Sequence, residues 1–197
     1  AHELKINASH YLPVNKLNIP IGKINPVSNS QFDFLNPRSL AGIVKGTNQP
    51  IDHNFCLNDK RSTLREVAVL TSKLSKIKLR VLSTETGLQF YTGHHLLDTP
   101  PGYRNLPYTP FSGLCLEPQG WPDAPNKKNF PSVFLPANTP YQQIICFEFS
   151  KNWQYLFGIP NKRKLIYTCL NYFYKFHKVN TKRQRAPDSS KKIDNPY

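Results

Sequence analysis

The chain of 197 residues is long enough for one domain with a sizeable core, either alone or followed by a tail. Its 26 Lys and Arg outnumber its 12 Asp and Glu. No stretch reaches the roughly 18 consecutive apolar residues of a membrane helix. Polar residues also interrupt positions 1–15 too often for a signal peptide. The chain lacks Met and starts at Ala1, so we expect a fragment or a processed chain, with no membrane partner.

Most of the chain, in order, consists of short alternating segments separated by Pro, Gly and Asn. Such alternation predicts antiparallel strands with one face on a core, and it occurs at 4–8, 77–81 and 145–149. A helix signal appears at 36–40, where Asn36 can cap and Pro37 suits the first turn. Strands dominate, so the predicted class is an all-β sandwich.

Residues 112–126 read SGLCLEPQGWPDAPN and contain a carboxylate at an unusual place. Leu114 and Leu116 alternate with Cys115 and Glu117, which predicts a half-buried strand that stops at Pro118. Glu117 then faces away from the leucines. Taken alone, this pattern favours a solvated edge charge over a carboxylate at the mouth of a pocket, because buried Glu is uncommon.

The composition changes after residue 149. Residues 1–149 hold 15 basic and 10 acidic residues, a net +5, whereas 150–197 hold 11 and 2, a net +9. Apolar residues at helical spacing within 162–182 allow a basic amphipathic helix for RNA or a membrane surface, but a poorly ordered basic extension is the simpler interpretation. We therefore assign 1–149 to the domain and expect no nucleic-acid partner.

The four cysteines are isolated from one another and from histidine clusters. This spacing argues against a zinc site and gives no disulfide framework, so we expect no metal and reduced thiols in a cytoplasmic protein. The positions concerned are Cys56, Cys115, Cys146 and Cys169.

Three motifs, in order, change the interpretation of Glu117. They are IDHNFCL at 51–57, GLQFYTG at 87–93 and SGLCLEPQGWPDAPNKKNFPS at 112–132. Together with the opening segment at 1–27, they resemble the C-terminal half of the aldose 1-epimerase (galactose mutarotase) family over about residues 1–149. The resemblance implies an antiparallel β-supersandwich, here incomplete at its N-terminal side.

The resemblance also implies interconversion of the α and β anomers of hexoses such as galactose and glucose, without a cofactor. Glu117 matches the family's catalytic base, and Asp52 and Gln89 match residues that bind the sugar. We expect these three side chains to share one face of a sheet. Taken alone, Asp52 reads as a turn residue and Gln89 as an exposed strand residue.

The family's general acid is a histidine in an N-H-[ST]-x-F-N-L motif, which these 197 residues do not contain. His94 and His95 stand where the family usually has Asn-Phe, and His53 reads as a structural partner. Trp121 is compatible with stacking on a sugar or with a core position. The alternative function is a non-catalytic carbohydrate-binding pseudoenzyme, and a third possibility is binding of RNA or anionic lipid by the +9 tail.

Overall fold

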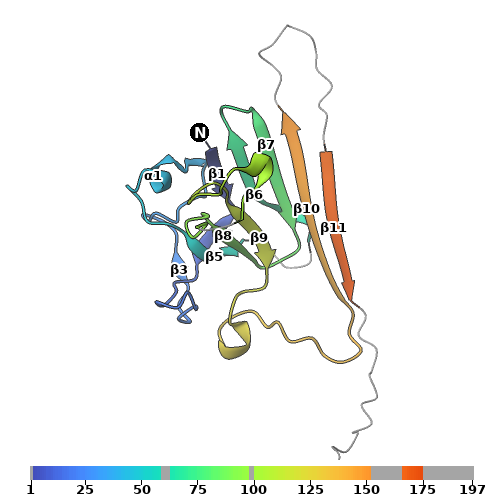
Figure 1. Cartoon of the computed structure of the whole chain (residues 1–197). Helices are drawn as coiled ribbons and strands as arrows, with labels where there is room; N and C mark the ends of the chain where they lie inside the picture. The colour runs from blue at the N-terminus through green and yellow to red at the C-terminus, as the bar shows by residue number, and fades with distance from the viewer. Residues whose placement is uncertain (1, 59–62, 98–99, 152–165, 175–197) are drawn as a thin grey trace, which may run out of the picture.

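The structure is a computed structural model, and it describes residues 2–58, 63–97, 100–151 and 166–174. Its strands form two antiparallel sheets (Figure 1). The six-stranded sheet has the order β11 (Ile166–Tyr174), β10 (Tyr141–Lys151), β7 (Ile77–Ser83), β6 (Arg65–Ser72), β1 (His2–Ile6) and β4 (Arg38–Ser39). The five-stranded sheet has the order β3 (Asn25–Pro26), β2 (Ala8–Tyr11), β5 (Asp52–Leu57), β8 (Gly87–Tyr91) and β9 (Cys115–Gln119).

Helical structure in the described residues is short. It comprises one turn of α-helix, α1 (Ala41–Val44), and two 3₁₀ segments, η1 (Tyr103–Asn105) and η2 (Ala124–Asn126). No helix in this part of the chain has the length and apolar character needed to cross a membrane. The all-β antiparallel class predicted from the alternating segments is confirmed.

The core lies between the two sheets. One cluster of buried residues joins Leu4 and Ile6 of β1 to Phe55 of β5 and to Leu88 and Phe90 of β8. The rings of Phe55 and Phe90 lie 6.3 Å apart, and both side chains are fully buried. Burying apolar surface at about 25 cal/mol per Å² is the main stabilising term, and it fixes which face of each strand points inward.

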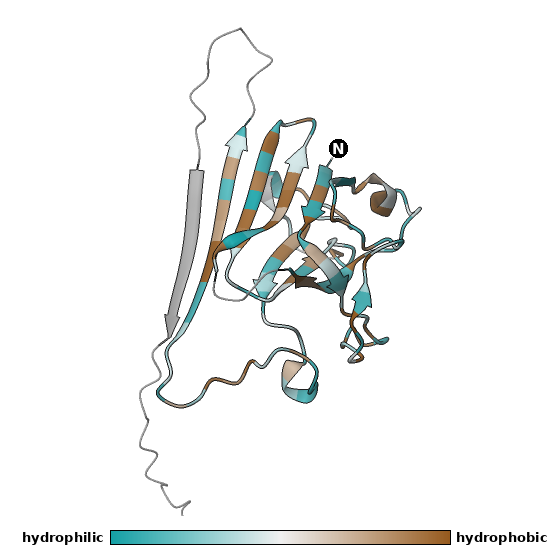
Figure 2. Ribbon diagram, turned by 180° about the vertical axis from the view of Figure 1, so that it is seen from behind, coloured by the Kyte–Doolittle hydropathy of each residue, from teal (hydrophilic) through white to brown (hydrophobic). Residues whose placement is uncertain are grey.

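Hydropathy alternates along strands of the six-stranded sheet (Figure 2), and charged side chains lie on its outer face. Arg80 of β7 forms ion pairs with Glu66 of β6 and Glu148 of β10, each with an N–O distance of 2.5 Å. Glu148 is also the register partner of Arg80. These pairs tie three neighbouring strands together on the face opposite the core.

The helix predicted from Asn36 and Pro37 begins later than expected. Residues Arg38 and Ser39 pair with β1 as strand β4, and α1 begins only at Ala41. The Ser39 hydroxyl accepts a hydrogen bond from the Ala41 amide at 3.2 Å. The interpretation of 36–40 as a helix start is therefore wrong, because strand pairing with β1 takes up these residues first.

Pro118 does not end its strand. Strand β9 continues to Gln119, one residue beyond the predicted stop. It is the outermost strand of its sheet, so a missing amide donor is tolerated if that side faces outward. The predicted alternation holds, since Leu116 is buried in the core and Glu117 is exposed on the other face.

Residues 166–174 form a strand that pairs with β10, so both interpretations of this stretch, a poorly ordered extension and part of an amphipathic helix, are wrong. Strand β11 pairs with β10 along nine residues. An unpaired edge of β10 offers a row of backbone donors and acceptors, and pairing with it outweighs an apolar spacing that is compatible with a helix. The rest of the predicted helix at 162–182 lies outside the described residues.

The cysteines differ from the expectation in one position. Cys56 and Cys115 are free, and burial raises the pKa of the Cys56 thiol to about 12, but Cys146 is in a disulfide. The register partner of Cys146 on β11 is Cys169. The prediction of four reduced thiols is wrong for Cys146, so the cytoplasmic location based on it stays a prediction.

Candidate functional site

The outward face of the five-stranded sheet carries a row of polar side chains. In the register, Asn54 of β5 lies opposite Gln89 of β8, and Gln89 lies opposite Glu117 of β9. Asp52 is two residues before Asn54, so it projects from the same face. The structure thus brings Asp52, Gln89 and Glu117 together on one face, as the sequence predicts.

Asp52 and Gln89 are in direct contact. The Gln89 Nε2 amide donates a hydrogen bond to Oδ1 of Asp52 at 2.7 Å. Asp52 is the first residue of β5, where the chain leaves the segment around Ile51, whose side chain is fully buried. This anchoring fixes the backbone at Asp52, while Oδ2 of its carboxylate remains available to another donor.

Glu117 stands beside this pair on the next strand. Its side chain is exposed, and within the described part of the chain its carboxylate has no hydrogen-bond partner. Directly opposite residues have Cβ atoms about 4.5–5.5 Å apart, so Gln89 separates Glu117 from Asp52 by one strand. An unpaired carboxylate on an open face can accept a proton or a hydroxyl hydrogen bond.

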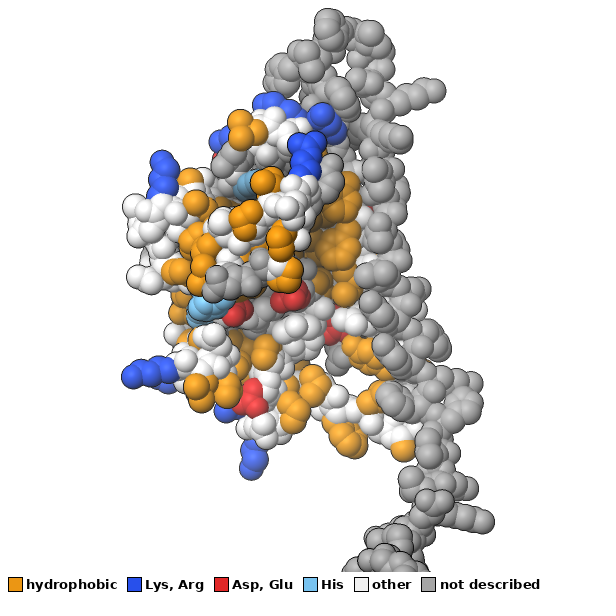
Figure 3. Space-filling model, viewed as in Figure 1, with side chains coloured by type: hydrophobic (Ala, Val, Ile, Leu, Met, Phe, Trp, Pro, Cys, Tyr) orange, Lys and Arg blue, Asp and Glu red, His pale blue; other side chains and the backbone are white. Residues whose placement is uncertain are grey.

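The negative charges of Glu117 and Asp52 both affect the pKa of the Cys115 thiol. The pKa of this thiol is raised, first by burial and then by the negative charges of Glu117 and Asp52. Cys115 lies opposite Tyr91 on the same face. Figure 3 shows acidic side chains close to a histidine side chain on the face that is viewed, next to a region of hydrophobic side chains.

His94 lies at the end of this face, after β8. Its ring is 5.1 Å from that of Tyr91, and its Nδ1 lies 3.1 Å from the Thr92 hydroxyl. Burial and the neighbouring His95 lower the pKa of His94, while Asp52 acts in the opposite direction. His94 is therefore within electrostatic range of the predicted sugar-binding carboxylate.

His53 projects from the opposite face, into the core. Its ring lies 4.7 Å from that of Phe32 and 5.9 Å from that of Tyr11, and its Nδ1 accepts a hydrogen bond from the Asp52 amide at 3.3 Å. Burial lowers the pKa of His53 more than the Asp52 charge raises it. The structural role predicted for His53 agrees with these contacts.

This geometry predicts an acid-sensitive fold. Because His53 binds a proton less readily when folded than when unfolded, its neutral form contributes stability above about pH 6.5 that is lost as the pH falls toward its lowered folded pKa. We expect the urea midpoint to fall between pH 7.5 and 5, and His53→Phe to flatten this dependence. The exposed His10 provides the control, since His10→Gln should leave the dependence in place. An unchanged slope in His53→Phe would refute the assignment.

Trp121 covers one end of the polar row. Its indole Nε1 donates to the Thr86 carbonyl at 2.9 Å, and its ring lies 5.1 Å from that of Phe130. It packs on a small second cluster that includes Leu12 and Cys56. These contacts correspond to the core position that the sequence allowed for Trp121.

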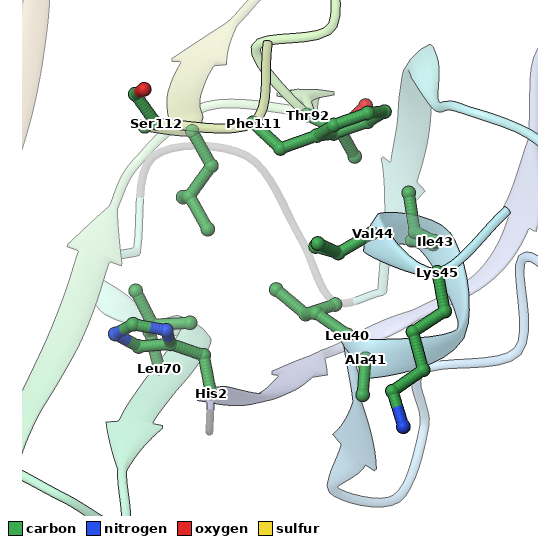
Figure 4. Close-up of a pocket in the computed structure, with 12 residues that line it drawn as sticks. His2, Leu40, Ala41, Ile43, Val44, Lys45, Leu70, Thr92, Phe111 and Ser112 are labelled. Atoms are coloured by element: carbon green, nitrogen blue, oxygen red, sulfur yellow. The ribbon is translucent and has the colours of Figure 1, made fainter. Parts of the chain in front are cut away.

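A separate cavity of about 410 Å³ lies near α1 (Figure 4). Its walls are largely apolar and include Leu40, Ile43, Leu70 and Phe111. None of the three predicted site residues lines it. Within the described residues, no group of three His, Cys, Asp or Glu side chains is arranged to hold a metal ion.

Sequence reasoning missed Asn54. It lies in the middle of the row, on the strand that begins with Asp52, and its side chain is almost fully buried. The signal was present in IDHNFCL, where Asn54 falls two positions after the aspartate and therefore on the same face of the strand. Its significance depends on burial, which the sequence does not display.

Comparison with known proteins supports the resemblance found in the motifs. The family model described as aldose 1-epimerase matches residues 1–148. The chain is 37% identical over 150 residues to galactose mutarotase from Homo sapiens, covering 76% of this chain and 44% of that protein. It is 33% identical over 159 residues to aldose 1-epimerase from Escherichia coli K12, covering 75% and 44%.

The fold comparison gives the same result. The crystal structure of the GalM/aldose epimerase homologue from C. elegans matches with a TM-score of 0.68 and 26% identity, covering 76% of this chain and 46% of that chain. The match spans less than half the length of the two curated relatives, galactose mutarotase from Homo sapiens and aldose 1-epimerase from Escherichia coli. The matched part includes β5, β8 and β9, which carry the polar row.

Proposed function

Because the chain belongs to the aldose 1-epimerase family, we propose that it carries the base side of a site that interconverts α and β anomers of a hexose such as galactose or glucose. The observation that carries this proposal is the row of Asp52, Gln89 and Glu117 on one face, with Gln89 bonded to Asp52 at 2.7 Å. These are the residues that the family motifs assign to base and sugar binding.

The chemistry requires two proton carriers on the sugar. Glu117 accepts the proton of the anomeric hydroxyl while an acid protonates the ring oxygen, so the C1–ring oxygen bond breaks and an open-chain aldehyde forms. Rotation about the C1–C2 bond exposes the other face of the aldehyde. Reclosure returns both protons and gives the opposite anomer. An exposed carboxylate without a hydrogen-bond partner in the described residues suits the first role.

Asp52 and Gln89 orient the sugar. The hydrogen bond from Gln89 holds one oxygen of the Asp52 carboxylate and leaves Oδ2 to accept from a ring hydroxyl. A sugar bound by Asp52 of β5 and Gln89 of β8 lies beside β9, the strand next to β8, which carries Glu117. Sugar binding is thus assigned to β5 and β8, and proton transfer to β9, which are three consecutive strands of one sheet.

A non-catalytic carbohydrate-binding module is the second candidate. The observation that favours it is the Asp52–Gln89 pair, which offers sugar-binding groups without requiring any proton transfer. Such a module would bind a hexose through Asp52 and Gln89 without accelerating anomer exchange. The two candidates differ only in catalysis, so sugar binding tests what they share.

We expect the 197-residue chain to bind galactose weakly and Asp52→Asn to weaken that binding about tenfold, because a charge-assisted hydrogen bond is replaced by a neutral one. Titration followed by NMR measures both affinities. Glu3→Gln is the matched control, since it removes one negative charge from an ion pair on the other sheet. Equal affinity of Asp52→Asn and the unmodified chain would contradict the proposal, as would undetectable binding by the unmodified chain.

A further inference from the structure

Asn54 has a buried polar side chain for which the described residues supply no hydrogen-bond partner. Only 1% of its surface is exposed, and neither Oδ1 nor Nδ2 of its carboxamide has a hydrogen-bond partner in the described residues. Buried polar groups in proteins nearly always bind something, whether protein, water or ligand. An unpartnered carboxamide in the middle of a candidate site therefore calls for a bound group.

The fold makes room for this side chain at Gly87. A Cβ atom at position 87 would lie 2.5 Å from Oδ1 of Asn54 and 3.0 Å from Cδ1 of Trp121. Gly87 has no positive φ angle, so close approach, and not backbone conformation, explains the glycine. Gly87 and Trp121 thus hold the Asn54 carboxamide in place at the centre of the face.

A second unpartnered atom belongs to the residue directly opposite. Gln89 is the register partner of Asn54, and its Oε1 is buried without a hydrogen-bond partner. The other end of the same carboxamide donates to Asp52. Reversing the Gln89 amide would turn its oxygen toward the Asp52 carboxylate, so Oε1 has to find a donor elsewhere.

We propose that Asn54 is a positioning residue of the sugar site, and that its carboxamide together with Oε1 of Gln89 binds one O–H group. This group accepts a hydrogen bond from Nδ2 of Asn54 and donates one to Oε1 of Gln89. It is a water molecule in the free protein or a hydroxyl of the bound sugar. The sugar alternative rests on the proposed function, whereas the water alternative does not.

The consequence is a fixed orientation for the polar row. With Oε1 held on the Asn54 side, Gln89 keeps its Nε2 on Oδ1 of Asp52. The second oxygen of Asp52 then has a defined direction for a sugar hydroxyl. Asn54 acts through Gln89, and no contact with a reacting atom is required of it.

NMR of the full 197-residue chain with ¹⁵N-labelled side-chain amides tests this directly. In the sugar-free protein we expect cross-relaxation between the Asn54 amide protons and a long-lived water. If the position is filled only when a sugar binds, the cross peak to water is absent from the sugar-free protein. Added galactose then shifts the Asn54 and Gln89 amide signals together. Absence of a bound water combined with unshifted signals at saturating galactose would overturn the proposal.

Substitution provides the second measurement. Asn54→Leu keeps the branching and the number of side-chain heavy atoms and removes both unpartnered polar atoms, so a variant that accommodates the larger methyl groups should have an unchanged or higher melting temperature. It should also shift the Gln89 amide signals and weaken galactose binding about three- to tenfold. Gln119→Leu is the matched control, because it removes a carboxamide from the same face at a position opposite Gly87 and should leave the Gln89 signals in place.

The outcomes separate this inference from the proposed function. If the unmodified chain binds no galactose, the proposed function fails, while the water cross peak and the Gln89 signals still decide the role of Asn54. Unchanged Gln89 signals in a folded Asn54→Leu variant would overturn it. If Asn54→Leu does not fold, the measurements on the unmodified chain decide.

Discussion

Replacing Glu117 by Gln is expected to lower mutarotase activity by about 10² to 10⁴ in a protein that contains the complete site, because one positioned acid or base is worth about that factor. Such a protein is made by taking the Homo sapiens relative and replacing the 150 residues that are 37% identical to this chain by this chain itself. Gln keeps the size and shape of Glu and one acceptor oxygen, but its neutral carboxamide cannot accept the proton. Polarimetry of α-D-galactose relaxing to its anomeric equilibrium measures the rate against the uncatalysed reaction.

The fold should be unaffected by this substitution. Glu117 is exposed on the edge strand β9, and its carboxylate has no hydrogen-bond partner in the described residues, so its loss leaves no buried group unpaired. Glu3→Gln in the same fused protein controls for the change in charge, because Glu3 lies on the other sheet. Full activity of Glu117→Gln would remove Glu117 from the mechanism.

The orientation of the site residues could be predicted from alternation alone. Leu114 and Leu116 face the core because apolar surface drives them there, and this leaves Glu117 on the outer face. Strand length was less predictable. The sequence shows Pro118 as a stop, but an edge strand tolerates a proline, and being at the edge is a property of the sheet and not of the local sequence.

Which site side chains lie opposite one another depends on the register between strands, and the sequence alone does not give that register. Nothing in IDHNFCL or GLQFYTG states that Asn54 lies opposite Gln89, or that Gln89 reaches Asp52 at 2.7 Å. The need for glycine at position 87 likewise follows from the approach of Asn54 and Trp121, which are distant in sequence. Motifs name the residues of such a site, and sheet pairing arranges them.

In the stretch at 166–174 the sequence pattern suggested a structure that does not form. Ile166, Cys169, Leu170 and Phe173 have a spacing that suits a helix, yet they lie in a strand. Nine residues pair with β10, whose other side already pairs with β7. Local periodicity was outweighed by a long-range partner, which a window of sequence cannot contain.

The 197-residue chain by itself is expected to be a poor mutarotase. It carries the proposed base, but these 197 residues lack the family's histidine motif for the acid. Water then has to protonate the ring oxygen in place of a positioned acid. The structure adds a second reason. Leu79, Leu114, Leu116, Phe147 and Phe149 line an open apolar hollow of about 360 Å³ between the two sheets.

An uncovered apolar hollow favours association with another surface, so we expect limited solubility of the isolated chain and its improvement when the preceding family portion is joined. Polarimetry of the isolated chain should give relaxation close to the uncatalysed rate, while the fused protein relaxes galactose faster by at least the factor of about 10² assigned to the acid. Fast relaxation by the isolated chain would refute this expectation. It would also direct attention to His94, whose Nδ1 lies 3.1 Å from the Thr92 hydroxyl and whose pKa responds to Asp52, as a substitute proton donor. His94→Gln in the isolated chain would then have to abolish the activity, because no acid from the preceding portion is present to replace it.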